Sequence, residues 1–197
     1  MAMNSSPTAL IAVDVQSGFD DPSFPPTTGF PGCEDNIALL VRHWTTARPG
    51  PFVVVRHDSA QPASPLHPTH PGNRLKPLVE PDRADLLVTK SVNSAFLGQP
   101  DLHAWLTQRG VRDLVICGIQ TNWCVETTAR MAGNLGYRTA VALDATRTFD
   151  LASPIDGLGP VWLSAAELMR ATALNLQTGG FARVVTTASQ LGLGADD

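Results

Sequence analysis

Short, continuous apolar runs alternate along the chain with segments whose apolar residues recur at helical spacing. The continuous runs are typical of strands that are buried on both faces of a sheet. In residues 34–46, by contrast, Ile37, Leu40, Val41 and Trp44 fall on one face of a helix. The pattern predicts strands at residues 9–15, 52–56, 85–89, 113–117, 138–143 and 181–186.

Helices are expected between these strands, at residues 34–46, 101–109, 123–134 and 164–176. Gly110 and Gly136 follow two of them, as C-terminal glycines do. Ser164 and Glu167 have the spacing of a capping box. Strands that alternate with helices predict an α/β protein, a three-layer α-β-α sandwich around a mostly parallel sheet. We expect one domain over residues 1–197, with residues 1–7 flexible and no internal repeat.

Composition narrows the class of protein. The 197 residues are 43% hydrophobic and 16% charged, which is typical of a globular chain, and the net charge is −4. The chain has no basic block and no long apolar run, so neither a nucleic-acid nor a membrane partner is expected. Residues 1–7 do not resemble a signal peptide. Three cysteines at no framework spacing favour free thiols in the cytoplasm.

Three reactive side chains follow predicted strands. Asp14 stands at the end of the first strand, Lys90 just after the third, and Cys124 after the fourth, across a tight turn. Taken singly, the aspartate is typical of a turn, the lysine of a solvated surface and the cysteine of a core. Because ligands bind at the carboxyl ends of parallel strands, we expect these three residues to converge there.

Together these residues could perform nucleophilic catalysis. A cysteine at a helix N-terminus is expected to have a lowered pKa, which favours the thiolate. Asp14 could take the thiol proton, and Lys90 could supply positive charge. The backbone N–H groups of Gln120 and Cys124 could form an oxyanion hole.

Three motifs carry a resemblance to a known family. They are Asp14-x-Gln16-x-x-Phe19, Lys90-Ser91-x-x-Ser94-Ala95-Phe96 and Gly118-Ile119-Gln120-Thr121-x-x-Cys124-Val125. In this order they resemble the isochorismatase-like cysteine hydrolase superfamily, which includes nicotinamidases and N-carbamoylsarcosine amidohydrolases. The resemblance implies a six-stranded, Rossmann-like sheet, an Asp-Lys-Cys triad and a homo-oligomer. It also implies a cis peptide at Ile119–Gln120, which would turn the Gln120 N–H toward the oxyanion.

The sequence departs from the nicotinamidases at their metal site. Those enzymes carry an Asp-x-His unit after the second strand, whereas this chain reads His57-Asp58-Ser59-Ala60. His67 and His70, with His57 or Asp58, could in principle hold zinc. The prolines around them favour a stiff loop over residues 58–81 instead, so no metal and no cofactor are expected.

The leading hypothesis is a hydrolase that cleaves a C–N bond of a small amide, ureide or carbamoyl compound through a thioester on Cys124. One alternative is a vinyl-ether hydrolase of the isochorismatase type with Asp14 as its acid, and another is a non-catalytic or redox-sensing protein. The loops at 58–83 and 148–163 are expected to determine the substrate. Candidate pocket residues are Phe19, His57, Asn93, Phe96, Trp123 and Arg147. The three aromatic side chains could equally belong to the core, and His57 could cap its strand instead of binding substrate.

Overall fold

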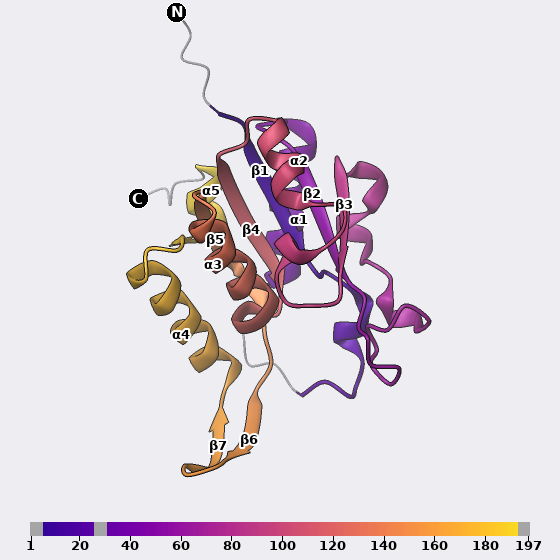
Figure 1. The fold of residues 1–197 in the computed structure, drawn as a ribbon, viewed down its shortest axis with the longest axis vertical. Coiled ribbons are helices and arrows are strands. Elements are labelled where there is room, and N and C mark those ends of the chain that lie inside the picture. Colours follow the sequence, from indigo (N-terminus) through magenta and orange to yellow (C-terminus); the bar gives the residue numbers. More distant parts are fainter. Residues whose placement is uncertain (1–5, 26–30, 193–197) are drawn as a thin grey trace, which may run out of the picture.

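Six parallel strands form the central sheet of the computed structural model, which describes residues 6–25 and 31–192 (Figure 1). Their order across the sheet is β3-β2-β1-β4-β5-β8. The six predicted strands and the parallel arrangement are thereby confirmed, while most of the predicted flexible segment 1–7 lies outside the described residues. The strands span Thr8–Val13 (β1), Phe52–His57 (β2), Leu86–Lys90 (β3), Asp113–Ile119 (β4), Arg138–Arg147 (β5) and Arg183–Val185 (β8).

Helices cover both faces of this sheet and complete the predicted three layers. Along β1, Leu10 and Ala12 pack on one face and Ile11 and Val13 on the other, so the strand is buried on both sides. One layer contains α1 (Cys33–Thr46) and α5 (Thr187–Leu191). The other contains α2 (Leu102–Gln108), α3 (Glu126–Asn134) and α4 (Ala165–Thr178). The predicted capping box of Ser164 and Glu167 begins α4.

An antiparallel hairpin replaces the loop that was expected at residues 148–163. Its strands are β6 (Leu151–Ile155) and β7 (Gly159–Leu163), and they project from the body of the molecule (Figure 1). Pro154 and Pro160 lie opposite each other in this pair. Proline is rare inside strands, and the hairpin has no buried face to produce an apolar pattern. The sequence therefore contained no signal for it.

The remaining segments are mostly short turns. The loop at 58–81 contains single helical turns at Pro71–Asn73 and Pro77–Val79, and others lie at Ser17–Asp20, Pro81–Arg83 and Ala95–Leu97. A π-helical turn, Thr121–Val125, leads into α3, so the predicted helix start at 123 lies inside this turn. Within the described part of the chain, no helix is long and apolar enough to cross a membrane.

The carboxyl ends of the strands meet at one edge of the sheet, as their parallel direction requires. In the register, Val13 of β1 lies beside Gly118 of β4, and His57 of β2 lies beside Lys90 of β3. Asp14 follows Val13 directly. The edge therefore brings together side chains that are far apart in the sequence.

Candidate active site

Asp14 and Lys90 form a buried ion pair at this edge. The Lys90 Nζ atom lies 2.5 Å from Asp14 Oδ2, and neither side chain is exposed to solvent. Asp14 has a φ of 53°, a left-handed conformation that aspartate tolerates better than most residues. Burial raises the pKa of the Asp14 carboxyl above its ordinary value, although the charge and hydrogen bond of Lys90 act to lower it. A carboxyl group with a raised pKa holds a proton more readily than an ordinary aspartate, as a group that must both accept and release a proton requires.

The Cys124 thiol lies close to this pair. Its Sγ, a carboxylate oxygen of Asp14 and a ring nitrogen of His57 are all within 4.8 Å of one another. The thiol donates to Asn93 Oδ1 at 3.8 Å. Burial, followed by the charge of Asp14, raises the pKa of Cys124 to about 12, against the lowering effect of the Lys90 charge. The lowered thiol pKa expected at a helix start was wrong, because the thiol is buried beside a carboxylate.

The turn before Cys124 winds around one carbonyl group. The N–H groups of Trp123 and Val125 donate to the Gln120 carbonyl at 3.2 and 3.1 Å. The Ile119–Gln120 peptide bond is cis. Gly118, with a φ of 124°, passes so close to β1 that a Cβ atom there would lie 2.0 Å from the Val13 carbonyl oxygen. Only glycine permits this approach, which brings the turn before Cys124 next to Asp14.

His57 is held in place through its backbone. Its N–H donates to Gln16 Oε1 at 2.8 Å, and its carbonyl accepts from Gln16 Nε2 at 3.0 Å and from Asn73 Nδ2 at 3.1 Å. Its ring Nδ1 lies 3.1 Å from Lys90 Nζ. Sequence reasoning assigned no role to Gln16 or Asn73. Gln16 stands in the first motif and could have been noticed there, whereas Asn73 lies in a long loop without any pattern.

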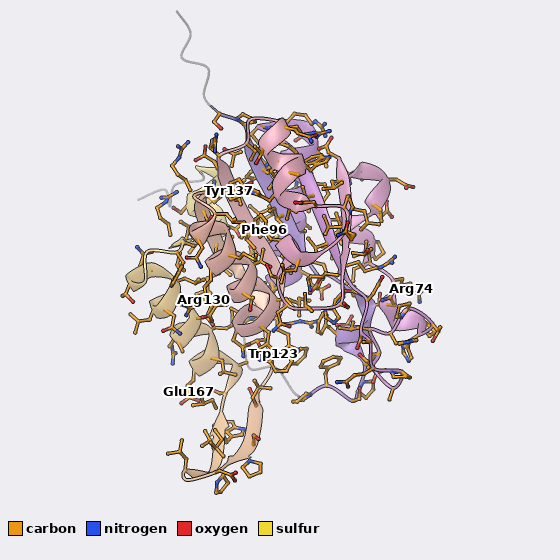
Figure 2. The ribbon with its side chains drawn as sticks, viewed as in Figure 1. Arg74, Phe96, Trp123, Arg130, Tyr137 and Glu167 are labelled. Atoms are coloured by element: carbon orange, nitrogen blue, oxygen red, sulfur yellow. The ribbon has the colours of Figure 1, made fainter. Side chains whose placement is uncertain are left out.

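The aromatic candidates occupy different surroundings. Trp123 is 46% exposed, and Figure 2 shows it at the end of α3 nearest the hairpin. Phe96 is buried and stacks on Tyr137 with a ring separation of 5.7 Å. Phe19 is buried in an aromatic cluster in which Phe24 and Phe149 are its ring partners. Trp123 is therefore the aromatic candidate that is open to a ligand, while Phe19 and Phe96 contribute to packing.

Arg147 is committed to a network of charges. Its guanidinium lies 3.0 Å from Asp20 Oδ1 and 3.9 Å from Glu34 Oε1. Lys76 also pairs with Asp20 and Glu34. Two cations and two carboxylates thus balance one another between α1 and the end of β5. This arrangement ties down the loop after β1, while the buried Nε atom of Arg147 has no hydrogen-bond partner among the described residues.

Two buried oxygens in the described residues of this region accept no hydrogen bond, Asp14 Oδ1 and Gln120 Oε1. Buried acceptors are costly when unpaired, so a bound molecule with N–H groups would satisfy them. In the same described ranges, Asp14, His57 and Cys124 make up the one cluster of three metal-ligating side chains. Lys90 contacts both Asp14 and His57, and its ammonium already supplies positive charge there.

His67 and His70 stand apart from this cluster. The Nδ1 atom of His67 lies 2.8 Å from Thr69 Oγ1, and that of His70 accepts from the Gly72 N–H at 3.0 Å. Both rings thus make hydrogen bonds within their own loop. Among the residues that the structure describes, neither of them joins His57 or Asp58 in a group of three potential ligands.

Comparison with known proteins shows the family to which the chain is related. Residues 8–189 match the family model of the isochorismatase domain. The isochorismatase family protein YrdC of Bacillus subtilis (strain 168) is 34% identical, with 91% of each chain covered. The ureidoacrylate amidohydrolase RutB of Variovorax paradoxus (strain S110) is 27% identical over 90% of this chain and 78% of its own. An isochorismatase-family crystal structure from Chromobacterium violaceum ATCC 12472 superposes with a TM-score of 0.83 and 37% identity, covering 98% of this chain and 95% of the other.

Proposed function

The chain belongs to the isochorismatase family, and on that premise we propose that it is a cysteine hydrolase of a small amide, ureide or carbamoyl compound. The observation that carries this proposal is the cluster of Asp14, Lys90 and Cys124 at one buried edge of the sheet. A thiol, a proton acceptor and a fixed cation are what acyl transfer to sulfur requires. Similarity to an amidohydrolase supports cleavage of a C–N bond.

The first step is attack by sulfur. Because the pKa of Cys124 is about 12, the resting residue is a thiol, and Asp14 takes its proton as the sulfur attacks the substrate carbonyl. The C–S bond forms, and the carbonyl electron pair moves to oxygen. We assign the N–H groups of Gln120 and Cys124 to this oxyanion. The Lys90 ammonium remains beside Asp14 throughout.

The second step releases the nitrogen. The carboxyl group of Asp14, now protonated, donates to the leaving nitrogen as the C–N bond breaks, so ammonia or an amine departs and a thioester remains on Cys124. Water then attacks the thioester while Asp14 accepts one of its protons. The thiolate leaves, takes that proton back from Asp14, and the free acid is released. One carboxyl group serves alternately as base and acid, which its raised pKa permits.

The unpaired oxygens suggest what the substrate carries. Asp14 Oδ1 and Gln120 Oε1 are buried acceptors, and amides, ureides and carbamoyl groups provide N–H donors for such atoms. The half-exposed Trp123 ring, one residue before the nucleophile, offers an apolar surface beside them. A small substrate with one N–H-rich end and one flat or apolar end fits these features.

An ammonia-release screen tests the proposal. Small primary amides, ureas and carbamoyl compounds are incubated with the wild-type protein and with Cys124→Ala, with Cys117→Ala as a matched control for a second buried thiol. We expect release by the wild type and the Cys117 variant and none by Cys124→Ala. A thioester adduct on the Cys124 peptide after acid quenching is the second expected result. Full turnover by Cys124→Ala would refute the mechanism.

A vinyl-ether hydrolase is the second candidate. The observation that favours it is the complete burial of the Asp14 side chain. Burial raises the pKa of the carboxyl and favours an acid that could protonate an enol-ether carbon without help from sulfur. In this case Cys124→Ala would keep its activity and Asp14→Asn would lose it. The same two variants, assayed on an aryl vinyl ether, therefore separate the two candidates.

We also propose that the protein acts in the cytoplasm as a homo-oligomer. Support for the first point is that Cys33, Cys117 and Cys124 are free, buried thiols. Support for the second is the hairpin, where Leu158 is 74% exposed and Trp162 60% exposed. Large apolar side chains at such exposure are typical of surfaces that another subunit covers.

A further inference from the structure

The Lys90 ammonium has two partners, not one. It lies 2.5 Å from Asp14 Oδ2 and 3.1 Å from His57 Nδ1. The strand order explains this, because β2, which ends in His57, lies between β1 and β3. Lys90 must therefore reach past the end of β2 to meet Asp14. The His57 ring lies next to the Lys90 side chain where that side chain extends toward Asp14.

The chemistry of the two groups fixes the direction of the hydrogen bond. An ammonium has three N–H donors and no acceptor. His57 Nδ1 must accept, so it carries no proton, and the neutral ring holds its hydrogen on Nε2. Burial, followed by the Lys90 charge, lowers the pKa of His57, which agrees with a neutral ring. With Asp14 and His57 taking two N–H groups, the third is left for Cys124 or a bound molecule.

The backbone around His57 is built to hold this ring. Both its N–H and its carbonyl are bonded to the side chain of Gln16, which is fully buried and stands two residues after Asp14. The carbonyl also accepts from Asn73, and the Lys90 carbonyl accepts from the Asp58 N–H at 2.7 Å. The segment that carries Asp14 thus also places the histidine. Capping the end of β2 would not require two hydrogen bonds from one buried side chain to the same backbone residue.

We infer that His57 is a positioning residue of this site: its Nδ1 accepts a hydrogen bond from Lys90 and holds the ammonium between Asp14 and Cys124. The hydrogen bond itself does not depend on the proposed function, but its role in supporting catalysis at Cys124 rests on that proposal. Its Nε2–H makes no hydrogen bond to the described residues, so this donor is available to a carbonyl or carboxylate oxygen of the substrate.

Alkylation of Cys124 tests the inference without any substrate. The side chains of asparagine and leucine have similar shapes, but only asparagine places an acceptor near the Nδ1 position. The second-order rate of iodoacetamide reaction at Cys124 is followed by peptide mass spectrometry for the wild type, His57→Asn and His57→Leu. His43→Asn, on α1 and away from the site, is the control.

We expect His57→Asn and His43→Asn to react like the wild type. His57→Leu should react about tenfold more slowly, because a hydrogen bond that orients a charged group has been removed. Equal rates for the asparagine and leucine variants, whether fast or slow, would overturn the inference, as would a faster leucine variant. The expected difference in alkylation rates, together with no hydrolysis of any compound by the wild type, would instead count against the proposed function and leave the inference intact.

The tautomer of His57 provides a second measurement that uses the unaltered protein. The chain has five histidines, and the resonances of His57 are assigned by their loss in His57→Asn. In ¹⁵N-labelled protein at neutral pH, we expect an unprotonated Nδ1 and a protonated Nε2 at this residue. A proton on Nδ1, or an imidazolium, would refute the hydrogen bond from Lys90. This result stands even if the leucine variant fails to fold.

Discussion

The variant Lys90→Met tests how much the buried ion pair of Asp14 and Lys90 contributes to the free energy of unfolding. Methionine has nearly the shape of the lysine side chain but no charge, so Asp14 stays in place without its partner. Both side chains of the pair have no exposure to solvent, so water cannot take the place of the ammonium. The variant therefore leaves an uncompensated carboxylate within the sheet edge.

The expected cost follows from this burial. Removing one partner of a buried ion pair destabilises a protein by about 3–5 kcal/mol. Asp14 can reduce this cost by binding a proton, since Lys90 is the main group that opposes the rise in its pKa. The loss should then depend on pH, because protonation removes the isolated charge.

The sign of that dependence is determined by the Asp14 pKa. In the folded protein this pKa is raised above its ordinary value of 3.8, so the folded state binds the proton more tightly than the unfolded chain. The stabilisation is complete below the unfolded pKa and is lost as the pH rises through the folded one. Without Lys90 the folded pKa rises further, so Lys90→Met should lose more stability at pH 8 than at pH 5.

Urea unfolding followed by the fluorescence of the four tryptophans measures these free energies at both pH values and at fixed protein concentration. The matched controls are Asp14→Asn and the Asp14→Asn/Lys90→Met double variant. Asparagine tolerates the left-handed conformation at this position and removes the charge. We expect the double variant to be more stable than Lys90→Met at pH 8. A Lys90→Met variant with wild-type stability at pH 8, or with the same loss at both pH values, would refute the reasoning.

Three further predictions concern other parts of the molecule. Gly118→Ala should melt at a much lower temperature than Gly136→Ala, because only the Gly118 variant places a Cβ atom 2.0 Å from a backbone oxygen. The Gly136 variant incurs only the cost of about 1–2 kcal/mol for its left-handed backbone. Equal melting temperatures of the two variants would contradict this prediction. For an amide found in the screen, kcat/KM should rise with pH through the raised pKa of Asp14, since the ionised carboxylate is the proposed base. A kcat/KM that falls as the pH rises from acid values would exclude that role. Trp162→Ser should dissociate the proposed homo-oligomer in sedimentation experiments, because this side chain, 60% exposed in the single chain, would lie in the interface between subunits. A wild-type protein that sediments as a monomer would rule out this subunit interface.

Much of the fold could be predicted because its signals are local. A strand buried on both faces requires a continuous apolar run, and a helix on a sheet requires apolar residues on one face, so both patterns appear in the sequence. Ser164 and Glu167 form their capping box within a single turn. The hairpin of β6 and β7 was missed because its pairing is exposed and carries prolines, and hence leaves no such pattern.

The sequence by itself determined which reactive residues follow the strands: Asp14, Lys90 and Cys124. Their meeting follows from parallel strand direction, which alternation with helices already implies. Only the tertiary structure decided how they behave. The pKa of Cys124 is raised because the thiol is buried beside a carboxylate, whereas its place near a helix start had suggested the opposite.

The surroundings of Lys90 also depend on tertiary structure. His57 contacts Lys90 because β2 lies between β1 and β3, and Gln16 and Asn73 reach it from separate segments. Spacing along the chain carries no record of such contacts. Hydrogen bonds and pKa values depend on distances of a few ångströms and on the exclusion of water. These distances and this exclusion exist only once the strands and loops have packed together at the site.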